Sequence, residues 1–205
     1  MIDLYAAPTT NGLRAKITLE ECGLDYTLHR VNMAEKEHKT PEFLKLNPLG
    51  QTPVIIDQDA PGGPLTMCQS MAILFYVCEK AGKYIPTDPA KRAAFWEPVM
   101  HAATELGPGY GAIPFITRWE QQDDHAKDMF VNRYRTHMDH CDAILAKQQY
   151  FAGNEITLAD FAAFGIITRA KSTYPEMGEG FANVDRWHDE LAARPGVQKG
   201  LDFGD

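Results

Sequence analysis

The sequence predicts an α/β domain followed by an all-α domain, and three observations support this division. Over residues 1–83, short strand-like segments and segments with apolar residues at helical spacing follow one another in the order βαβαββα. The segment at about 84–88 carries a proline and borders another, which is typical of a linker. Over residues 89–205 every periodic segment has helical spacing. We therefore expect a βαβαββα domain over 1–83 and a helical bundle over 89–205.

The first half of the α/β domain starts with a strand and a turn. Residues 2–5 predict a short strand, and the turn Pro-Thr-Thr-Asn-Gly at 8–12 leads into a helix. The helix over 13–22 carries an apolar stripe and stops before a glycine. Residues 26–31 alternate as a second strand, and the Thr-Pro pair that opens 40–44 predicts the start of a short helix.

The second half of this domain contains two more strands and a helix. Residues 54–56 form an apolar β-branched run, and the turn 59–63 separates it from an edge-like strand at 65–67. Residues 70–80 have apolar side chains at helical spacing and are followed by a glycine.

The helical domain is predicted to contain a long, interrupted first helix. It covers about 90–118, and the Gly-Pro-Gly segment 107–109 predicts a kink or a break. A second helix covers roughly 125–147, and the sequence Thr-Leu-Ala-Asp at 157–160 predicts a capping box at the start of a third. A last helix is expected over about 184–194, ended by the Pro-Gly pair that follows.

Composition argues against two broad classes of function. The chain has 205 residues, of which 44% are hydrophobic, so it can form a substantial core. Its formal net charge is −8, whereas nucleic-acid binding needs clustered cations. The sequence has no apolar run of the about 18 residues that a membrane span requires, and its acidic start does not resemble a signal peptide. We expect a cytoplasmic protein without nucleic-acid or membrane partners.

The four cysteines do not have the spacing of a metal site. There is no CxxC pair and no Cys/His cluster with zinc spacing, so no metal cofactor is expected. Cys22, Cys78 and Cys141 fall within helical apolar patterns and are predicted to be buried thiols. Cys68 precedes Gln69 directly, and a packing role is favoured for it over a redox role.

Pro53 stands directly before the third strand, where it predicts a docking point for a peptide. A proline fits the first residue of a strand, and a cis bond is largely restricted to X-Pro. A cis bond here would turn the Thr52 backbone outward, so that its N–H and C=O can pair with another peptide. Gln69 and Ser70 open the next helix, whose N–H groups and dipole favour a carboxylate. Together these segments predict a peptide-like anionic ligand, although each alone also fits an ordinary turn or helix cap.

Four motifs follow one another along the chain. They are Pro8-Thr9-Thr10-Asn11-Gly12, Asn47-Pro48-Leu49-Gly50-Gln51-Thr52-Pro53, Gln69-Ser70-Met71-Ala72-Ile73 and Thr157-Leu158-Ala159-Asp160. In this order they resemble the cytosolic glutathione S-transferase superfamily over essentially the whole chain. This resemblance implies a thioredoxin-like N-terminal domain and the all-helical domain of that family. The turn further resembles that of bacterial Nu-class enzymes, some of which act on disulfides.

The resemblance implies that glutathione is the cosubstrate and supplies the reacting sulfur, because the turn has no cysteine. A free thiol has a pKa of about 8.5, and donors at a helix N-terminus lower it. The implied thiolate donors are Thr9 and Asn11, with Thr10 left open as an alternative. The simpler interpretations are that the threonines shape the turn and that Asn11 is only an N-cap.

The resemblance also implies the contacts that hold the rest of glutathione. Gln51 is expected at the glycyl end or the backbone of glutathione, and His38 at the glycyl carboxylate. Arg133 is expected to come from the partner subunit of a homodimer. The full implied set is Thr9, Asn11, His38, Gln51, Thr52, Pro53, Gln69, Ser70 and Arg133, with Thr52-Pro53 at the cysteinyl unit and Gln69-Ser70 at the γ-glutamyl group. His38 can instead be a surface residue, and Arg133 part of a solvated basic face.

The second substrate is expected to be a small hydrophobic electrophile, a disulfide or a peroxide. Tyr110, Phe115, Ile116 and Trp119 are candidates for the wall of its site, although helix packing explains each equally well. The implied function is a glutathione-dependent transferase or thiol–disulfide oxidoreductase. The alternatives are a specialised glutathione-dependent isomerase, dehalogenase or ether-cleaving enzyme, and a non-enzymatic binding module of the same fold.

Overall fold

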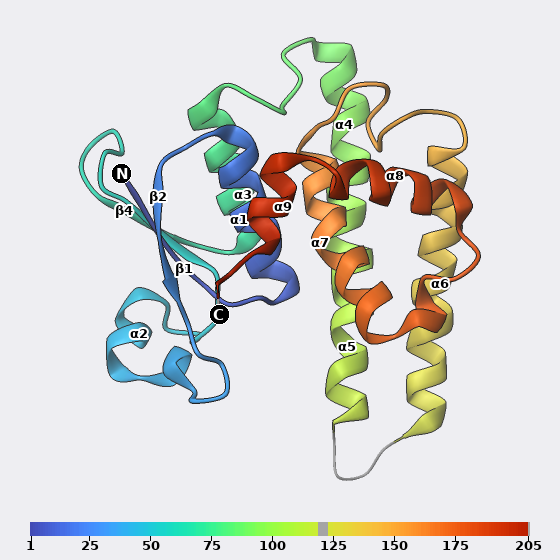
Figure 1. The fold of residues 1–205 in the computed structure, drawn as a ribbon, viewed down its shortest axis with the longest axis horizontal. Coiled ribbons are helices and arrows are strands. Elements are labelled where there is room, and N and C mark those ends of the chain that lie inside the picture. The colour runs from blue at the N-terminus through green and yellow to red at the C-terminus, as the bar shows by residue number, and fades with distance from the viewer. Residues whose placement is uncertain (119–122, 205) are drawn as a thin grey trace. The chain divides into compact units, whose positions relative to one another are not determined.

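The structure, a computed structural model, describes residues 1–118 and 123–204 and forms two compact units (Figure 1). One unit contains residues 1–83 and 193–204, and the other contains 84–192. The predicted α/β domain followed by helices is confirmed. Within the described ranges, no helix combines the length and the apolar character of a membrane span.

A four-stranded mixed sheet forms the centre of the first unit. Its strands are β1 (Ile2–Ala6), β2 (Tyr26–Arg30), β3 (Val54–Asp57) and β4 (Leu65–Cys68), in the order β2-β1-β3-β4. β1 pairs parallel with β2 and antiparallel with β3, and β4 joins β3 antiparallel. β4 is therefore an edge strand, as predicted.

The helices of this unit are α1 (Thr10–Cys22), α2 (Pro41–Leu46), α3 (Ser70–Ala81) and α9 (Pro195–Leu201), with the 3-10 turn η1 (Glu37–Lys39) before α2. α1 packs against both α3 and α9. Apolar side chains from the sheet and from α1 and α3 are fully buried, among them Leu4, Ile17, Ile55, Ile73 and Leu74. This core places the first turns of α1 and α3 at the surface of one domain.

The second unit is a helical bundle whose first helix is interrupted as predicted. The chain changes from α-helix to π-helix over Ala102–Leu106 and returns to α-helix at Gly107. The interruption precedes Pro108, which has no N–H and crowds the preceding turn of a regular helix. The helices are α4 (Pro89–His101), η2 (Ala102–Leu106), α5 (Gly107–Thr117), α6 (Asp124–Leu145), α7 (Leu158–Thr173), η3 (Pro175–Met177) and α8 (Ala182–Ala192).

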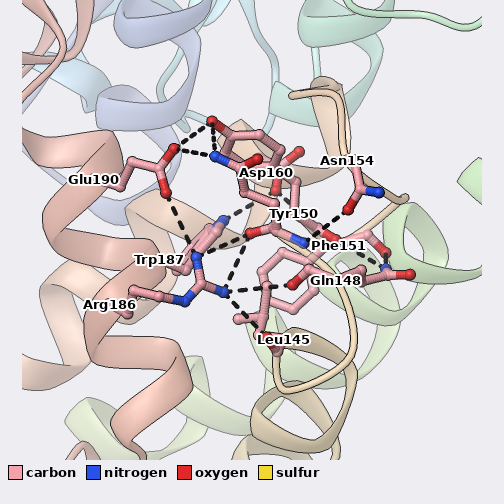
Figure 2. Close-up of polar contacts among 10 residues, drawn as sticks. Leu145, Gln148, Tyr150, Phe151, Asn154, Asp160, Arg186, Trp187 and Glu190 are labelled. Carbon is pink, nitrogen blue, oxygen red and sulfur yellow. Dashed lines mark hydrogen bonds and ion pairs between the residues drawn. The ribbon is translucent and has the colours of Figure 1, made fainter.

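The capping box at the start of α7 is confirmed. The buried Asp160 carboxylate accepts the backbone N–H of Thr157 at 2.8 Å. It also accepts the backbone N–H of Phe151 and the indole N–H of Trp187, each at 3.0 Å (Figure 2). Burial raises the pKa of Asp160, and these donors oppose the rise. Nearby, Arg186 of α8 donates to the carbonyl at the end of α6 at 3.1 Å. These contacts join α6, α7 and α8 into one unit.

The end of the chain differs from expectation. The helix expected over about 184–194 is present as α8 and ends before Pro195. It is not the last helix, because Pro195 occupies the first turn of α9, where its missing N–H costs nothing. α9 packs on α1 so closely that a Cβ on Gly200 would lie 2.6 Å from the Ile17 Cα. Residues 193–204 therefore belong to the first unit, whereas the sequence-based division placed them with the helices.

Candidate functional site

Thr9 caps α1. Its backbone is extended, and its Oγ1 accepts the Gly12 N–H at 3.2 Å. The simpler interpretation of Asn11 as the N-cap is therefore wrong. Asn11 lies instead in the first turn of the helix with an exposed side chain.

The start of α1 can hold an anion. Oγ1 of Thr9 is used as an acceptor, so its O–H remains available to donate to a ligand. The N–H groups of Thr10 and Asn11 lie in the first turn, where helix geometry provides no intrahelical acceptor. These donors and the helix dipole favour a negative charge such as a thiolate.

A cleft of about 440 Å³ borders Thr9. One part of its wall is apolar. Arg30 contributes a positive charge and Glu37 a negative charge to another part, so the cleft can receive a ligand of mixed character. Its lining residues are Ala7, Pro8, Thr9, Arg30, Val31, Asn32, Met33 and Glu37.

The Thr52–Pro53 peptide bond is cis, as the sequence suggested. The ladder between β3 and β4 begins after it, with Val54 opposite Cys68. In the described part of the chain, neither the N–H nor the C=O of Thr52 makes a hydrogen bond. Both groups are therefore available to a peptide.

The turn before Thr52 brings the His38 backbone close to Gly50, the residue before Gln51. Asn47 Nδ2 donates to the Gln51 carbonyl at 2.7 Å. Gly50 has a positive φ of 57°, and a Cβ there would lie 2.6 Å from the His38 carbonyl oxygen, so only glycine fits. Nδ1 of His38 is buried, and no described residue bonds to it. Lys39, which the sequence did not single out, donates to the Gly50 carbonyl at 3.0 Å and adds a cation here.

Gln69 and Ser70 lie at the start of α3, as predicted. Gln69 has a φ of 70°, which is rare for a side-chain-bearing residue, and its exposed side chain does not cap the helix. Ser70 is the first residue of α3 and is buried. Its Oγ accepts Nε of Arg14 at 3.1 Å and Nη2 of Arg14 at 2.6 Å.

Sequence reasoning missed Arg14. The residue is only 7% exposed, and Nη1 has no hydrogen-bond partner among the described residues. Burial lowers the pKa of Arg14 to about 10, so the guanidinium stays charged at neutral pH. The sequence did contain one signal for Arg14. It follows Asn11 by three positions, and residues three apart lie on the same face of a helix.

Arg133 lies in the other unit, on α6, and is exposed. Its Nη2 donates to Oε2 of Glu105 at 2.7 Å. The neighbouring Arg135 has a structural role, because it donates to the carbonyl of Glu179 and lies 4.9 Å from the Phe181 ring. The two arginines therefore do not form one solvated basic face.

The candidates for the second-substrate wall are dispersed. Tyr110 is buried against the rings of Tyr134 and Tyr174, which favours the packing interpretation. Phe115 is 81% exposed, and Trp119 lies outside the described residues.

The cysteines fit structural roles. Burial raises the pKa of the Cys68 thiol, the opposite of what a reactive thiolate needs, and its Sγ lies 3.5 Å from the Leu46 carbonyl oxygen. Cys22, Cys78 and Cys141 are buried, as predicted. Across the described ranges, no three His, Cys, Asp or Glu side chains are arranged to hold a metal ion.

Two family profiles match this chain in order. The Glutathione S-transferase, N-terminal domain, matches residues 1–79, and the Glutathione S-transferase, C-terminal domain, matches residues 94–195. The disulfide-bond oxidoreductase YfcG of Escherichia coli is 30% identical over 98% of this chain and 94% of its own length.

Solved structures agree in fold over nearly the whole chain. A glutathione transferase family member from Pseudomonas fluorescens, with two glutathione bound, has a TM-score of 0.92 at 33% identity and covers 98% of this chain and 92% of its own. A glutathione transferase from Pseudomonas putida, with one glutathione disulfide bound per subunit, has a TM-score of 0.90 at 31% identity and covers 100% and 92%.

Proposed function

The chain belongs to the glutathione S-transferase family, and from this premise we propose that it is a glutathione-dependent enzyme whose main reaction is thiol–disulfide exchange. The observation that carries the proposal is the cysteine-free donor turn at the start of α1. A site that stabilises a thiolate without a thiol of its own needs a ligand that brings the sulfur.

The tripeptide is proposed to span the surface sites of the first unit. Its sulfur lies at Thr9 and Asn11, and its cysteinyl backbone pairs with the free backbone groups of Thr52, beside Pro53. The glycyl carboxylate lies near Gln51, His38 and Lys39. The γ-glutamyl group lies at Gln69 and Ser70. The unpaired backbone groups of Thr52 support this placement.

The reaction follows from the position of the sulfur. The glutathione thiolate attacks one sulfur of a disulfide, a new S–S bond forms, and the other half leaves as a thiolate that takes up a proton. The cleft beside Thr9 has room for the second half of such a disulfide. The relative named as a disulfide-bond oxidoreductase and the neighbour solved with glutathione disulfide support this choice.

Conjugation to a small hydrophobic electrophile is the second candidate reaction. The apolar residues Pro8, Val31 and Met33 in the wall of the cleft favour it. The same thiolate would then attack carbon, and the leaving group would depart from the electrophile.

Homodimerisation is part of the proposal, because two-fold dimers are the commonest oligomers. Arg133 is proposed to reach the glutathione of the partner subunit, where a guanidinium suits a carboxylate. The exposure of Arg133 supports this role, although it pairs with Glu105 in the single chain. A cytoplasmic location stays a prediction from the sequence.

A paired assay with glutathione tests the proposal. One arm supplies hydroxyethyl disulfide and the other an aryl halide, and calorimetry measures glutathione binding separately. We expect rapid disulfide reduction and slow conjugation. Rapid conjugation without reduction would overturn the proposed main reaction, glutathione binding without either reaction would favour a specialised enzyme of the family, and absence of glutathione binding would favour the non-enzymatic module.

A further inference from the structure

Ser70 and Arg14 form a buried pair that joins the start of α3 to α1. Ser70 Oγ accepts two N–H groups of the Arg14 guanidinium, at 3.1 Å and 2.6 Å. Both side chains are more than nine-tenths buried. The pair therefore lies beneath the surface of the helix N-terminus rather than in solvent.

The two hydrogen bonds determine where the Ser70 hydrogen points. A hydroxyl oxygen has two acceptor lone pairs and one O–H. Both bonds come from one edge of the Arg14 guanidinium, which has donors and no acceptor, so the O–H of Ser70 must point away from it. It becomes a donor polarised by a cation, and such charge-assisted bonds are about twice as strong as neutral ones.

The charge of Arg14 is uncompensated within the described chain. Burial is the one influence on its pKa, with no carboxylate acting on it, and its Nη1 has no hydrogen-bond partner among the described residues. A buried cation without a counter-ion is costly, so an anion bound nearby would recover part of that cost. Lys16 on the same helix provides the contrast, because its buried ammonium donates to the carbonyls of Lys199 and Asp202.

We propose that Arg14 is a positioning residue for the α-carboxylate of the γ-glutamyl group of glutathione, acting through the Ser70 hydroxyl. This inference rests on the proposed function and adds a residue to it. The carboxylate completes a relay in which Arg14 donates to Ser70 and Ser70 donates to the ligand. The N-terminal dipole of α3 acts on the same anion.

The position of Ser70 selects this carboxylate over the glycyl one. The glycyl end is assigned to the turn at Gln51, where Lys39 already supplies a cation. At α3, the exposed Gln69 amide can accept from the ligand ammonium through its oxygen. An amino acid head group, with both charges on one carbon, fits these neighbours.

The test compares glutathione with two analogues in calorimetry. Glutaryl-Cys-Gly keeps the carboxylate and lacks the amine, and 4-aminobutanoyl-Cys-Gly keeps the amine and lacks the carboxylate. We expect Arg14→Met to weaken glutathione and the glutaryl analogue by at least about tenfold, the effect of one charge-assisted bond. Binding of the 4-aminobutanoyl analogue should not change.

A second comparison tests the path through Ser70. In a Ser70→Ala background the relay is already broken, so adding Arg14→Met should change glutathione affinity by less than about threefold. A full tenfold loss in that background would show that Arg14 acts directly and would overturn the relay.

Lys16→Met is the matched control for loss of a buried cation on α1. It removes donors from two carbonyls, so we expect a lower Tm and equal effects on all three ligands. Arg14→Met removes an uncompensated charge as well as two hydrogen bonds to Ser70, and these effects oppose each other, so the Tm of the unliganded protein should fall less than in Lys16→Met. It should reduce the Tm gain on adding glutathione.

The possible failures are distinguishable. If the unsubstituted protein does not bind glutathione, both the proposed function and the relay are overturned. If it binds glutathione and Arg14→Met retains the same preference among the three ligands, only the relay is overturned.

Discussion

His101 of α4 and His137 of α6 are joined by a hydrogen bond of 3.0 Å between His101 Nε2 and His137 Nδ1. His137 Nε2 lies 3.3 Å from Oε2 of Glu105, a carboxylate that accepts only. His137 Nε2 must therefore carry a hydrogen, and when His137 is neutral, His101 Nε2–H donates to His137 Nδ1. The same Glu105 oxygen accepts from Arg133, so the pair ends at a candidate binding residue.

This pair predicts a pH-dependent stability. Burial, together with the nearby His137 and His140, lowers the pKa of His101 to about 4, whereas an unfolded histidine titrates near about 6.5. Between these values the unfolded chain binds more protons, so the free energy of unfolding falls as pH falls from about 6.5 to about 4. His101→Gln should make this decline shallower in urea titrations.

The control for that experiment is Met100→Gln, which changes an exposed neighbour on α4 and keeps the histidine. Its decline with pH should match that of the unsubstituted protein. An equally steep decline in His101→Gln would show that other groups cause the pH dependence.

Thr9 and Asn11 are predicted to differ in their effect on stability. Thr9→Ala removes both the cap of α1 and a proposed thiolate donor, so it should lower the free energy of unfolding by about 1 kcal/mol and also raise the pKa of the bound thiol. Asn11→Ala leaves the cap intact and should raise only the pKa of the bound glutathione thiol, since a lost charge-assisted donor costs about 1.5–3 kcal/mol. Ultraviolet absorbance of the thiolate during a pH titration measures the second effect.

Thr9→Ser keeps both the cap acceptor and the hydroxyl donor, so it should behave like the unsubstituted protein. If the thiol pKa stays constant in Asn11→Ala, Asn11 does not stabilise the thiolate.

The ion pair between Arg194 and Glu21 is predicted to stabilise the return of the chain to the first unit. Arg194 Nη2 lies 2.6 Å from Glu21 Oε2, and the Glu21 side chain is only 4% exposed. Arg194→Ala should lower the free energy of unfolding by about 1–3 kcal/mol. Breaking a fully buried pair costs about 3–5 kcal/mol, and the loss here is smaller because the Arg194 side chain is 34% exposed. Chemical denaturation measures the cost.

Lys91→Ala is the matched surface control, because Lys91 and Glu155 are 60% and 78% exposed. It should cost less than about 1 kcal/mol. Equal costs for the two substitutions would argue against a special role of the Arg194–Glu21 pair.

Gly200 is predicted to be required for the packing of α9 on α1. A Cβ at this position would meet backbone and side-chain atoms of Ile17 at 2.5–2.9 Å, so Gly200→Ala should destabilise by about 1–3 kcal/mol through overpacking. Gly111→Ala on α5 meets nothing within 4 Å and should be neutral or stabilising by about 0.5–1 kcal/mol. Thermal unfolding of both variants is the measurement, and a neutral Gly200→Ala would contradict the close approach.

Local signals made much of the fold predictable. The order of strands and helices, the capping box at Thr157 and Asp160 and the cis bond before Pro53 all depend on residues within a few positions of one another. The same locality explains why α9, which begins at Pro195, was not predicted. A Pro-Gly pair fits either the end of one helix or the first turn of the next, and only packing on α1 distinguishes them.

The candidate site was predictable in part. Thr9, Asn11, Gln69 and Ser70 were identifiable because helix starts have recognisable residues, and the structure places them there. Lys39 was not identifiable from the sequence. Its place in the site depends on the hydrogen bond to the Gly50 carbonyl, which the fold of the turn brings to it.

The sequence alone determined which positions of this chain carry hydrogen-bond donors. It also determined that the turn after the first strand has no thiol. The tertiary structure alone decided that Arg14 meets Ser70 across 56 positions and that α9 returns to α1. The physical reason is that caps and turns depend on neighbouring residues, whereas the effect of a buried charge depends on the packing that excludes water from it.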